Sequence, residues 1–198
     1  MKVGRLLLRA TVGGFFVGHG TQKLFGWFGG NGLKATADGF GKLGLHPPKV
    51  QALAAGAAET GGGAGVALGL ATPLSAAVLV ATMLTAINRV HLKNGPWSTK
   101  GGYEYNVVLI AAALTIAELG PGRLSLDAAR GRERAGAGWM LAALAAGAAG
   151  AAGAHLASEA LAPAPVTDDV APTPAATSTG SVSTQDGTAV TADPQPAS

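Results

Sequence analysis

The sequence predicts an all-α membrane protein, built as an antiparallel four-helix transmembrane bundle with a fifth, C-terminal transmembrane helix. Hydrophobic residues make up 48% of the 198 residues, whereas charged residues make up only 13%. Several stretches of about twenty residues run almost without charge, which is the length that crosses the hydrocarbon core of a bilayer. Prolines and glycines stand between these stretches, where helices begin and end.

The four segments of the predicted bundle are residues 3–20, residues 50–70, a segment that starts at residue 72, and residues 104–119. Thr72 is expected to cap the third helix, because a threonine followed by proline suits a helix N-terminus. Almost no loop then separates the second and third helices, which predicts a tight antiparallel hairpin. Gly120 and Pro121 end the fourth helix. The predicted core covers residues 1–130.

The fifth segment, residues 137–157, carries no formal charge, but it consists mostly of alanine and glycine. Alanine inserts into membranes only marginally, so a soluble alanine-rich helix is the alternative interpretation. Residues 158–198 contain six prolines and no aromatic residue, which predicts a disordered acidic tail that is rich in Pro, Ala, Thr and Ser.

The charge pattern favours membrane lipid as a partner and argues against nucleic acid. All 14 Lys and Arg lie within residues 1–157, while the tail has five acidic residues and no basic one. Basic and aromatic residues do not interleave as they do in nucleic-acid-binding proteins. The predicted loops hold seven Lys and Arg on each side, so the orientation depends on the arginine-rich connection at residues 123–134, which places the N-terminus in the cytoplasm.

Glu59 is the polar residue that most needs explanation, because it lies about 13 Å into the second segment at 1.5 Å per residue. A carboxyl group at that depth is expected to face the bundle interior, where it is either protonated or paired. Gly56 and Gly63 on the same face let another helix approach closely. Arg89 is one candidate partner. In the alternative, Arg89 extends to the headgroups and Glu59 bonds to a Thr or Asn.

Alternating helix directions bring several polar positions to the membrane side opposite the N-terminus. His19, Gln22 and Lys23 share one helical face by their i, i+3 and i+4 spacing. The predicted pocket is lined by His19, Gln22, Lys23, Glu59, Arg89, His91, Tyr103 and Glu104. A quinone headgroup would suit such donors. His19 and His91 lie on separate helices and could together bind a haem. In the alternative, they are simple polar caps. No metal site is predicted.

The connection between the first two segments contains an aromatic cluster at residues 25–28 and a short stretch at residues 33–43. Aromatic side chains of this kind lie at the headgroup level of a membrane. The connection is therefore interpreted either as an interfacial or re-entrant lid over the pocket or as a simple surface anchor.

Six motifs in order resemble the DoxX family of bacterial membrane proteins. They are HGTQKLFG at 19–26, GGNGL at 29–33, ETGG at 59–62, GLATP at 69–73, GGYEYN at 101–106 and GPGRLSLD at 120–127. The resemblance covers about residues 4–130 and excludes the fifth segment and the tail. It implies a multi-pass protein of the bacterial plasma membrane, related to the small subunit of a thiosulfate:quinone oxidoreductase. It implies no agreed set of catalytic residues.

Two functions of different classes follow. The first is a membrane subunit of a redox system, which passes electrons to quinone or docks soluble redox partner proteins. The second is a non-enzymatic membrane scaffold or small-molecule carrier. The chain has no cysteine, so any sulfur redox step would need a partner.

Overall fold

The computed structural model describes residues 2–164, and the described chain is all-helical, without a β-strand. Its seven α-helices are α1 (Val3–Phe25), α2 (Gly32–Lys42), α3 (Pro48–Leu68), α4 (Thr72–Ala86), α5 (Glu104–Leu119), α6 (Leu126–Ala129) and α7 (Ala137–Ala160). Four short helical segments lie between them: η1 (Trp27–Gly29), η2 (Ile87–His91), η3 (Leu92–Asn94) and η4 (Ser98–Lys100). The prediction of an all-α protein is confirmed. Most of the predicted tail lies outside the described residues.

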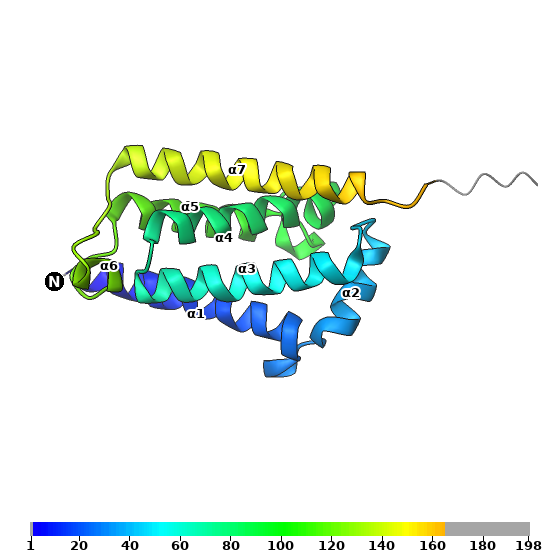
Figure 1. Ribbon diagram of the computed structural model, residues 1–198, viewed down its shortest axis with the longest axis horizontal. Helices are drawn as coiled ribbons and strands as arrows, with labels where there is room; N and C mark the ends of the chain where they lie inside the picture. Colours follow the sequence, from blue (N-terminus) through cyan, green and yellow to red (C-terminus); the bar gives the residue numbers. More distant parts are fainter. Residues whose placement is uncertain (1, 165–198) are drawn as a thin grey trace, which may run out of the picture. The chain divides into compact units, whose positions relative to one another are not determined.

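Five long helices lie side by side, and the chain reverses direction from each to the next (Figure 1). α3 packs against α1 and α4, and α4 also packs against α5 and α7. α2 contacts α3 and α1 at the end of the bundle away from the N-terminus, whereas α6 lies near the N-terminus. The predicted boundaries of the fourth helix agree with α5, and α7 starts where the fifth segment was expected and continues to Ala160.

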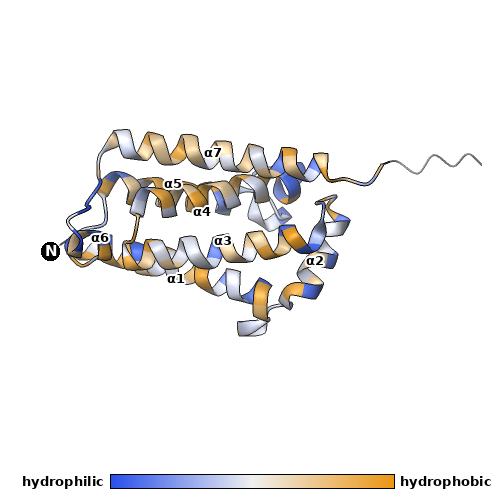
Figure 2. Ribbon diagram, viewed as in Figure 1, coloured by the Kyte–Doolittle hydropathy of each residue, from blue (hydrophilic) through white to orange (hydrophobic). Residues whose placement is uncertain are grey.

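The core is made of small and medium apolar side chains from five helices. Its buried members are Val12, Phe16, Val66, Ala76, Ala77, Leu79, Val80, Met83, Ala113, Ile116, Ala117 and Ala143. Large apolar side chains also cover the outer surface, since Leu7, Phe15, Leu74 and Val108 are each more than 60% exposed. Figure 2 shows apolar residues along the long helices and hydrophilic residues gathered at the two ends of the bundle. The helices are therefore apolar both inside and outside.

Two helical stretches of the described chain are long and apolar enough to cross a membrane, Thr72–Asn94 and Ala137–Ala160. The first runs continuously through α4, η2 and η3, with a π-helical turn at Ile87–His91. α5 has 16 residues and is therefore only about 24 Å long, against about 30 Å for a hydrocarbon core. Membrane crossing by α1, α3 and α5 stays a prediction.

Helix ends differ from the predicted positions in three helices. α3 runs from Pro48 to Leu68, two residues earlier at each end than the predicted residues 50–70. α1 continues past residue 20 and ends at Phe25. Gly26 is its C-cap, with a φ of 74° in the left-handed region that glycine favours. The N-cap of α4 is Ala71 and not Thr72. The expected cap was wrong because Thr72 is already helical, and its hydroxyl donates to Asp127 instead.

Candidate functional site

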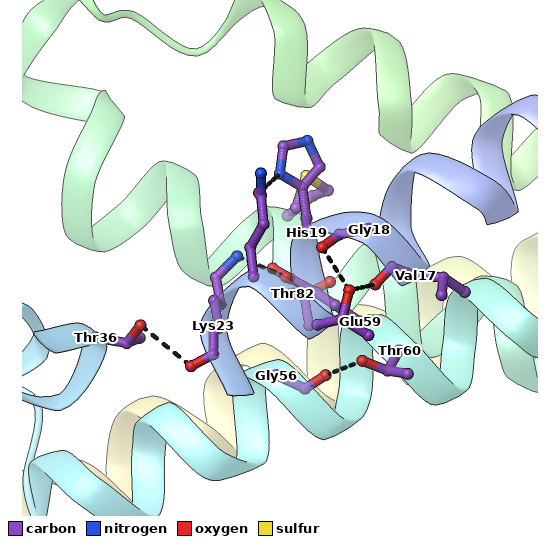
Figure 3. A network of polar contacts seen from close by, with 12 residues as sticks. Val17, Gly18, His19, Lys23, Thr36, Gly56, Glu59, Thr60 and Thr82 are labelled. Carbon is purple, nitrogen blue, oxygen red and sulfur yellow. Dashed lines mark hydrogen bonds and ion pairs between the residues drawn. The ribbon is translucent and has the colours of Figure 1, made fainter. Parts of the chain in front are cut away.

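A lysine and a glutamate form an ion pair between α1 and α3. Lys23 Nζ lies 2.6 Å from Glu59 Oε2, and the two side chains are 27% and 7% exposed. Figure 3 draws this pair in a polar network that includes His19, Thr60 and Thr82. Taking two charges out of water costs several kcal/mol per ion, which close pairing only partly offsets. An ion pair kept within an apolar bundle marks a candidate functional site.

Glycines at the contact between α1 and α3 determine which residues face each other. A Cβ added to Gly13 would lie 2.5 Å from the Gly63 carbonyl oxygen, and one added to Gly20 would lie 2.6 Å from that of Gly56. The two backbones therefore approach without intervening side chains. Lys23 and Glu59 each follow one of these glycines by three positions. The glycine contact thus sets the register that brings the two charges together.

His19 and Gln22 extend the polar face of α1 beside this ion pair. His19 Nδ1 lies 3.1 Å from Gln22 Oε1, and the Gln22 amide donates to the carbonyl of Phe28 at 3.3 Å. The i, i+3 spacing correctly predicted that His19 and Gln22 share a face. Four predicted site residues, including Lys23 and Glu59, therefore lie near one another at the end of α1.

Arg89 does not reach Glu59, so the predicted pairing of these residues is wrong. Its guanidinium instead contacts α7, through a close contact with His155 Nδ1 and an ion pair of 3.2 Å with Glu159. The reason is that α7 packs directly on α4 and offers a nearer acceptor than α3. The alternative interpretation had Glu59 bonded to a Thr or Asn. It is also wrong on this point, because Glu59 bonds to Lys23.

The remaining predicted site residues lie around the connection between η2 and α5: His91 ends η2, Tyr103 precedes α5 and Glu104 begins it. His91 Nδ1 lies 2.7 Å from the Gly101 carbonyl oxygen, and the Glu104 carboxylate accepts a 2.8 Å hydrogen bond from the backbone N–H of Ser98. The Tyr103 backbone N–H donates to the carbonyl of Gly95. These bonds shape the connection itself. A single pocket shared by all eight residues, and a haem between His19 and His91, stay predictions.

Cavities lie at other places in the described chain, and three of them are compared by volume. The largest, about 960 Å³, lies between α2 and the start of α3 and is lined by Leu33, Lys34, Ala37, Asp38, Gly41, Lys42, Pro48 and Lys49. A second, of about 240 Å³, lies between α4 and α7 and includes Arg89 and His155. A third, of about 180 Å³, lies at the N-terminal end of α1. Among the eight predicted residues, Arg89 lines one of these three.

The aromatic cluster directly follows the candidate site in the chain. The ring centroids of Phe25 and Trp27 are 5.1 Å apart, and those of Trp27 and Phe28 are 6.5 Å apart. All three side chains are more than half exposed. Thr36 of α2 bonds to the carbonyl of Lys23 and so fixes α2 beside the same end of α1. This arrangement agrees equally with a lid and with a surface anchor.

Comparison with known proteins identifies the family. The DoxX family model matches residues 4–92. "Putative oxidoreductase CatD" of Bacillus subtilis is 33% identical over 126 residues, which cover 64% of this chain and 86% of that protein. The chain belongs to the DoxX family. No solved structure shows a significant match. α5, α6 and α7 lie outside the residues that the family model matches.

Sequence reasoning missed a polar cluster at the opposite end of this DoxX protein. Arg9 is 2% exposed, and its guanidinium donates to the carbonyls of Val66, Ala67, Pro121 and Leu124. The Asp127 carboxylate accepts from the backbone N–H groups of Ala71 and Thr72. The available signals were an arginine inside an apolar segment and an acidic residue at the end of the GPGRLSLD motif. The Arg9 and Asp127 side chains hold α6 and the α5–α6 connection against the α3–α4 hairpin.

Proposed function

We propose that this chain is a multi-pass membrane subunit of a redox system, and that its Lys23–Glu59 site binds the headgroup of a quinone. Two kinds of observation support the proposal. One is the apolar exterior of the long helices, and the other is the partly buried ion pair at the contact between α1 and α3. The name of the Bacillus subtilis relative, a putative oxidoreductase, points to the same class.

The outer surface of the helices supports insertion into a membrane. Exposed leucine, valine and phenylalanine side chains occur on α1, α3, α4, α5 and α7; they include Leu7, Phe15, Leu53, Leu74, Val107, Val108, Leu141 and Leu156. Monomeric soluble proteins rarely expose large contiguous apolar areas. We infer that α1, α3, α4 and α5 form the four-helix transmembrane bundle, that α7 is the fifth span, and that the N-terminus lies in the cytoplasm.

The Lys23–Glu59 pair supplies the groups that a quinone headgroup needs. The Lys23 ammonium has three N–H donors and can donate to a quinone oxygen while it keeps its bond to Glu59. Gln22 and His19 add polar groups on the same helix face. Bound quinone would supply two-electron chemistry, and its reduction to quinol consumes two protons. In that setting the two electrons would come from a soluble redox partner protein, and the two protons would come from water at this end of the bundle.

The alternative function is a membrane scaffold or small-molecule carrier. The close glycine contact between α1 and α3 supports this alternative, because such contacts serve helix association by themselves. In a pure scaffold the ion pair would only set the register of the two helices. The two functions differ in whether the protein binds a quinone.

The proposed function is tested by purifying the full chain in a mild detergent and extracting the lipids that remain bound. We expect the ultraviolet difference spectrum of the extract, oxidised minus reduced, to show a quinone in stoichiometric amount. The Glu133→Leu variant serves as the control, because Glu133 is exposed in the α6–α7 connection. An extract without quinone would favour the scaffold, and haem absorption bands in the protein would revive the bis-histidine hypothesis.

A further inference from the structure

The cavity at the N-terminal end of α1 is surrounded by positive charge. Its volume is about 180 Å³, and its lining includes Lys2, Arg5, Arg9 and Arg123 together with the backbone around Pro121 and Gly122. No acidic residue is among its lining residues in the described chain. The cavity therefore brings four cationic side chains together, from the start of α1 and from the α5–α6 connection.

Two of these cations are fixed in place by carbonyl groups. Arg9 Nε and Nη2 donate to the carbonyls of Val66 and Ala67 at 3.0 and 2.8 Å. Arg5 Nη1 donates to the carbonyl of Leu119 at 2.7 Å. A Cβ on Gly122 would lie 2.6 Å from Arg5 Nη2, so the Arg5 guanidinium lies directly against this glycine. The positive charges of Arg5 and Arg9 are thus preorganised before any ligand arrives.

Local acids do not neutralise this group of charges by ion pairing. Within residues 2–164, the ion pairs are Lys23–Glu59, Lys34–Asp38, Arg89–Glu159 and His155–Glu159, and they leave out all four cations of the cavity. The Asp127 carboxylate, which accepts hydrogen bonds from Ala71 and Thr72, offsets part of the charge of Arg9 but does not form an ion pair with it. Like charges held around one small space repel each other, so an anion in the cavity would be strongly favoured.

We propose that this cavity binds a phosphate group, and specifically the phosphodiester of an anionic phospholipid headgroup. Guanidinium groups match phosphate oxygens in geometry as well as in charge. The cavity volume of about 180 Å³ leaves room for a phosphate group. Leu6 and Leu124 also line the cavity, and Val3 and Leu7 are exposed beside it for acyl chains to cover. The assignment of the phosphate to a lipid rests on the proposed membrane location of the protein, but not on the proposed quinone site.

The proposal is tested with the full chain in neutral detergent micelles that contain either phosphatidylglycerol or phosphatidylcholine. Native mass spectrometry gives the apparent affinity for each lipid. We expect phosphatidylglycerol to bind more tightly, and the Arg123→Gln variant to bind it about fivefold more weakly, the usual effect of one basic residue near an anionic membrane surface. Arg132→Gln is the matched control, because Arg132 is exposed in the same region but does not line the cavity.

Arg123 is exposed, so its variant should fold; Lys2→Gln is a second, independent variant at another exposed position. Equal retention of both lipids, or equal weakening by Arg123→Gln and Arg132→Gln, would overturn the proposal. Inorganic phosphate is added in a separate arm. If it displaces the lipid at equal concentration, the source is free phosphate and the lipid assignment fails. Failure here leaves the quinone measurement unaffected, because Lys23 and Glu59 are unchanged in every variant.

Discussion

At the scale of single residues, each buried charge has a partner that a different helix supplies. Glu59 could be predicted to face protein, because its position within an apolar segment makes exposure to lipid costly. Its partner could not be predicted. Choosing between Lys23 and Arg89 requires knowing that α7 occupies the side of α4 on which Arg89 lies, and that glycines bring α1 against α3. Both facts depend on packing between distant segments.

Asp127 gives a prediction about the pH dependence of stability. Burial by itself would raise the pKa of this carboxyl, but hydrogen bonds from the Thr72 and Ala71 backbone and the Thr72 hydroxyl outweigh burial and lower the pKa below its usual value. A carboxyl with a lowered folded pKa stabilises the fold fully above its unfolded pKa, near 4, and loses this effect as pH falls through the folded pKa.

Asp127→Asn is therefore expected to lower the free energy of unfolding by about 1–2 kcal/mol at neutral pH, the usual contribution of a charged helix cap. Denaturant unfolding in detergent measures it. The gap between wild type and variant should shrink as the pH drops below about 4. Asp38→Asn is the control, because Asp38 is 62% exposed and its pair with Lys34 contributes little. A gap that stays constant with pH would contradict this account.

At the scale of helices, the contact between α1 and α3 depends on positions where only hydrogen fits. Gly13 and Gly14 are adjacent in α1, yet a Cβ on Gly13 would lie 2.5 Å from the backbone of α3, whereas one on Gly14 would have nothing within 4 Å. Gly13→Ala should therefore force α1 and α3 apart and destabilise the fold by about 1–3 kcal/mol, as overpacking usually does. Gly14→Ala should be tolerated.

The two glycine variants are compared by thermal unfolding in detergent. Because the glycine contact sets the register of α1 and α3, Gly13→Ala should also weaken any ligand binding that depends on the Lys23–Glu59 pair. Equal stability of the two variants would show that α1 and α3 are not held as closely as the structure describes.

Helix boundaries could be read from the sequence where proline or glycine marks them. Gly120 and Pro121 placed the end of α5 correctly, because a helix cannot continue through them. The predicted end of the first segment at residue 20 is five residues too early, since the apolar pattern ends there while the helix continues through the polar residues 19–23. Polar residues on one face are compatible with a helix that continues, and Gly26 provides the actual stop.

At the scale of the whole molecule, the sequence predicted an all-helical DoxX protein, and both points are confirmed. The number of membrane crossings is harder to derive. α1 and α3 carry charged and small residues along their lengths, which lowers their apolar character even where they are long enough to cross. These charged and small residues make the Lys23–Glu59 ion pair and the close contact between α1 and α3. They also lower the hydropathy by which a membrane-spanning helix is recognised in the sequence.

The topology can be tested with reporter fusions on both sides of α7. A reporter after Gly131 should be cytoplasmic, and a reporter after Ala162 should be on the other side, because α7 between them is long and apolar enough to cross. Cytoplasmic signals from both would mean that α7 lies along the membrane or against the bundle. Reversed signals would overturn the predicted orientation while leaving the span intact.

We expect the Lys23–Glu59 pair to serve ligand binding and not only structure. Glu59→Leu alone is uninformative, because it leaves a partly buried lysine unpaired, which typically costs about 3–5 kcal/mol. The double variant Lys23→Met with Glu59→Leu removes both charges at similar volume. Such replacements are often neutral or stabilising, so the double variant should fold.

The most direct measurement is a titration of the purified chain with a short-chain quinone, followed by quenching of tryptophan fluorescence. Wild type and the Glu133→Leu control should bind alike. The double variant should unfold at a temperature close to that of wild type but bind at least about tenfold more weakly, because a hydrogen bond from a charged group contributes about 1.5–3 kcal/mol. Unchanged quinone affinity in a well-folded double variant would contradict the account.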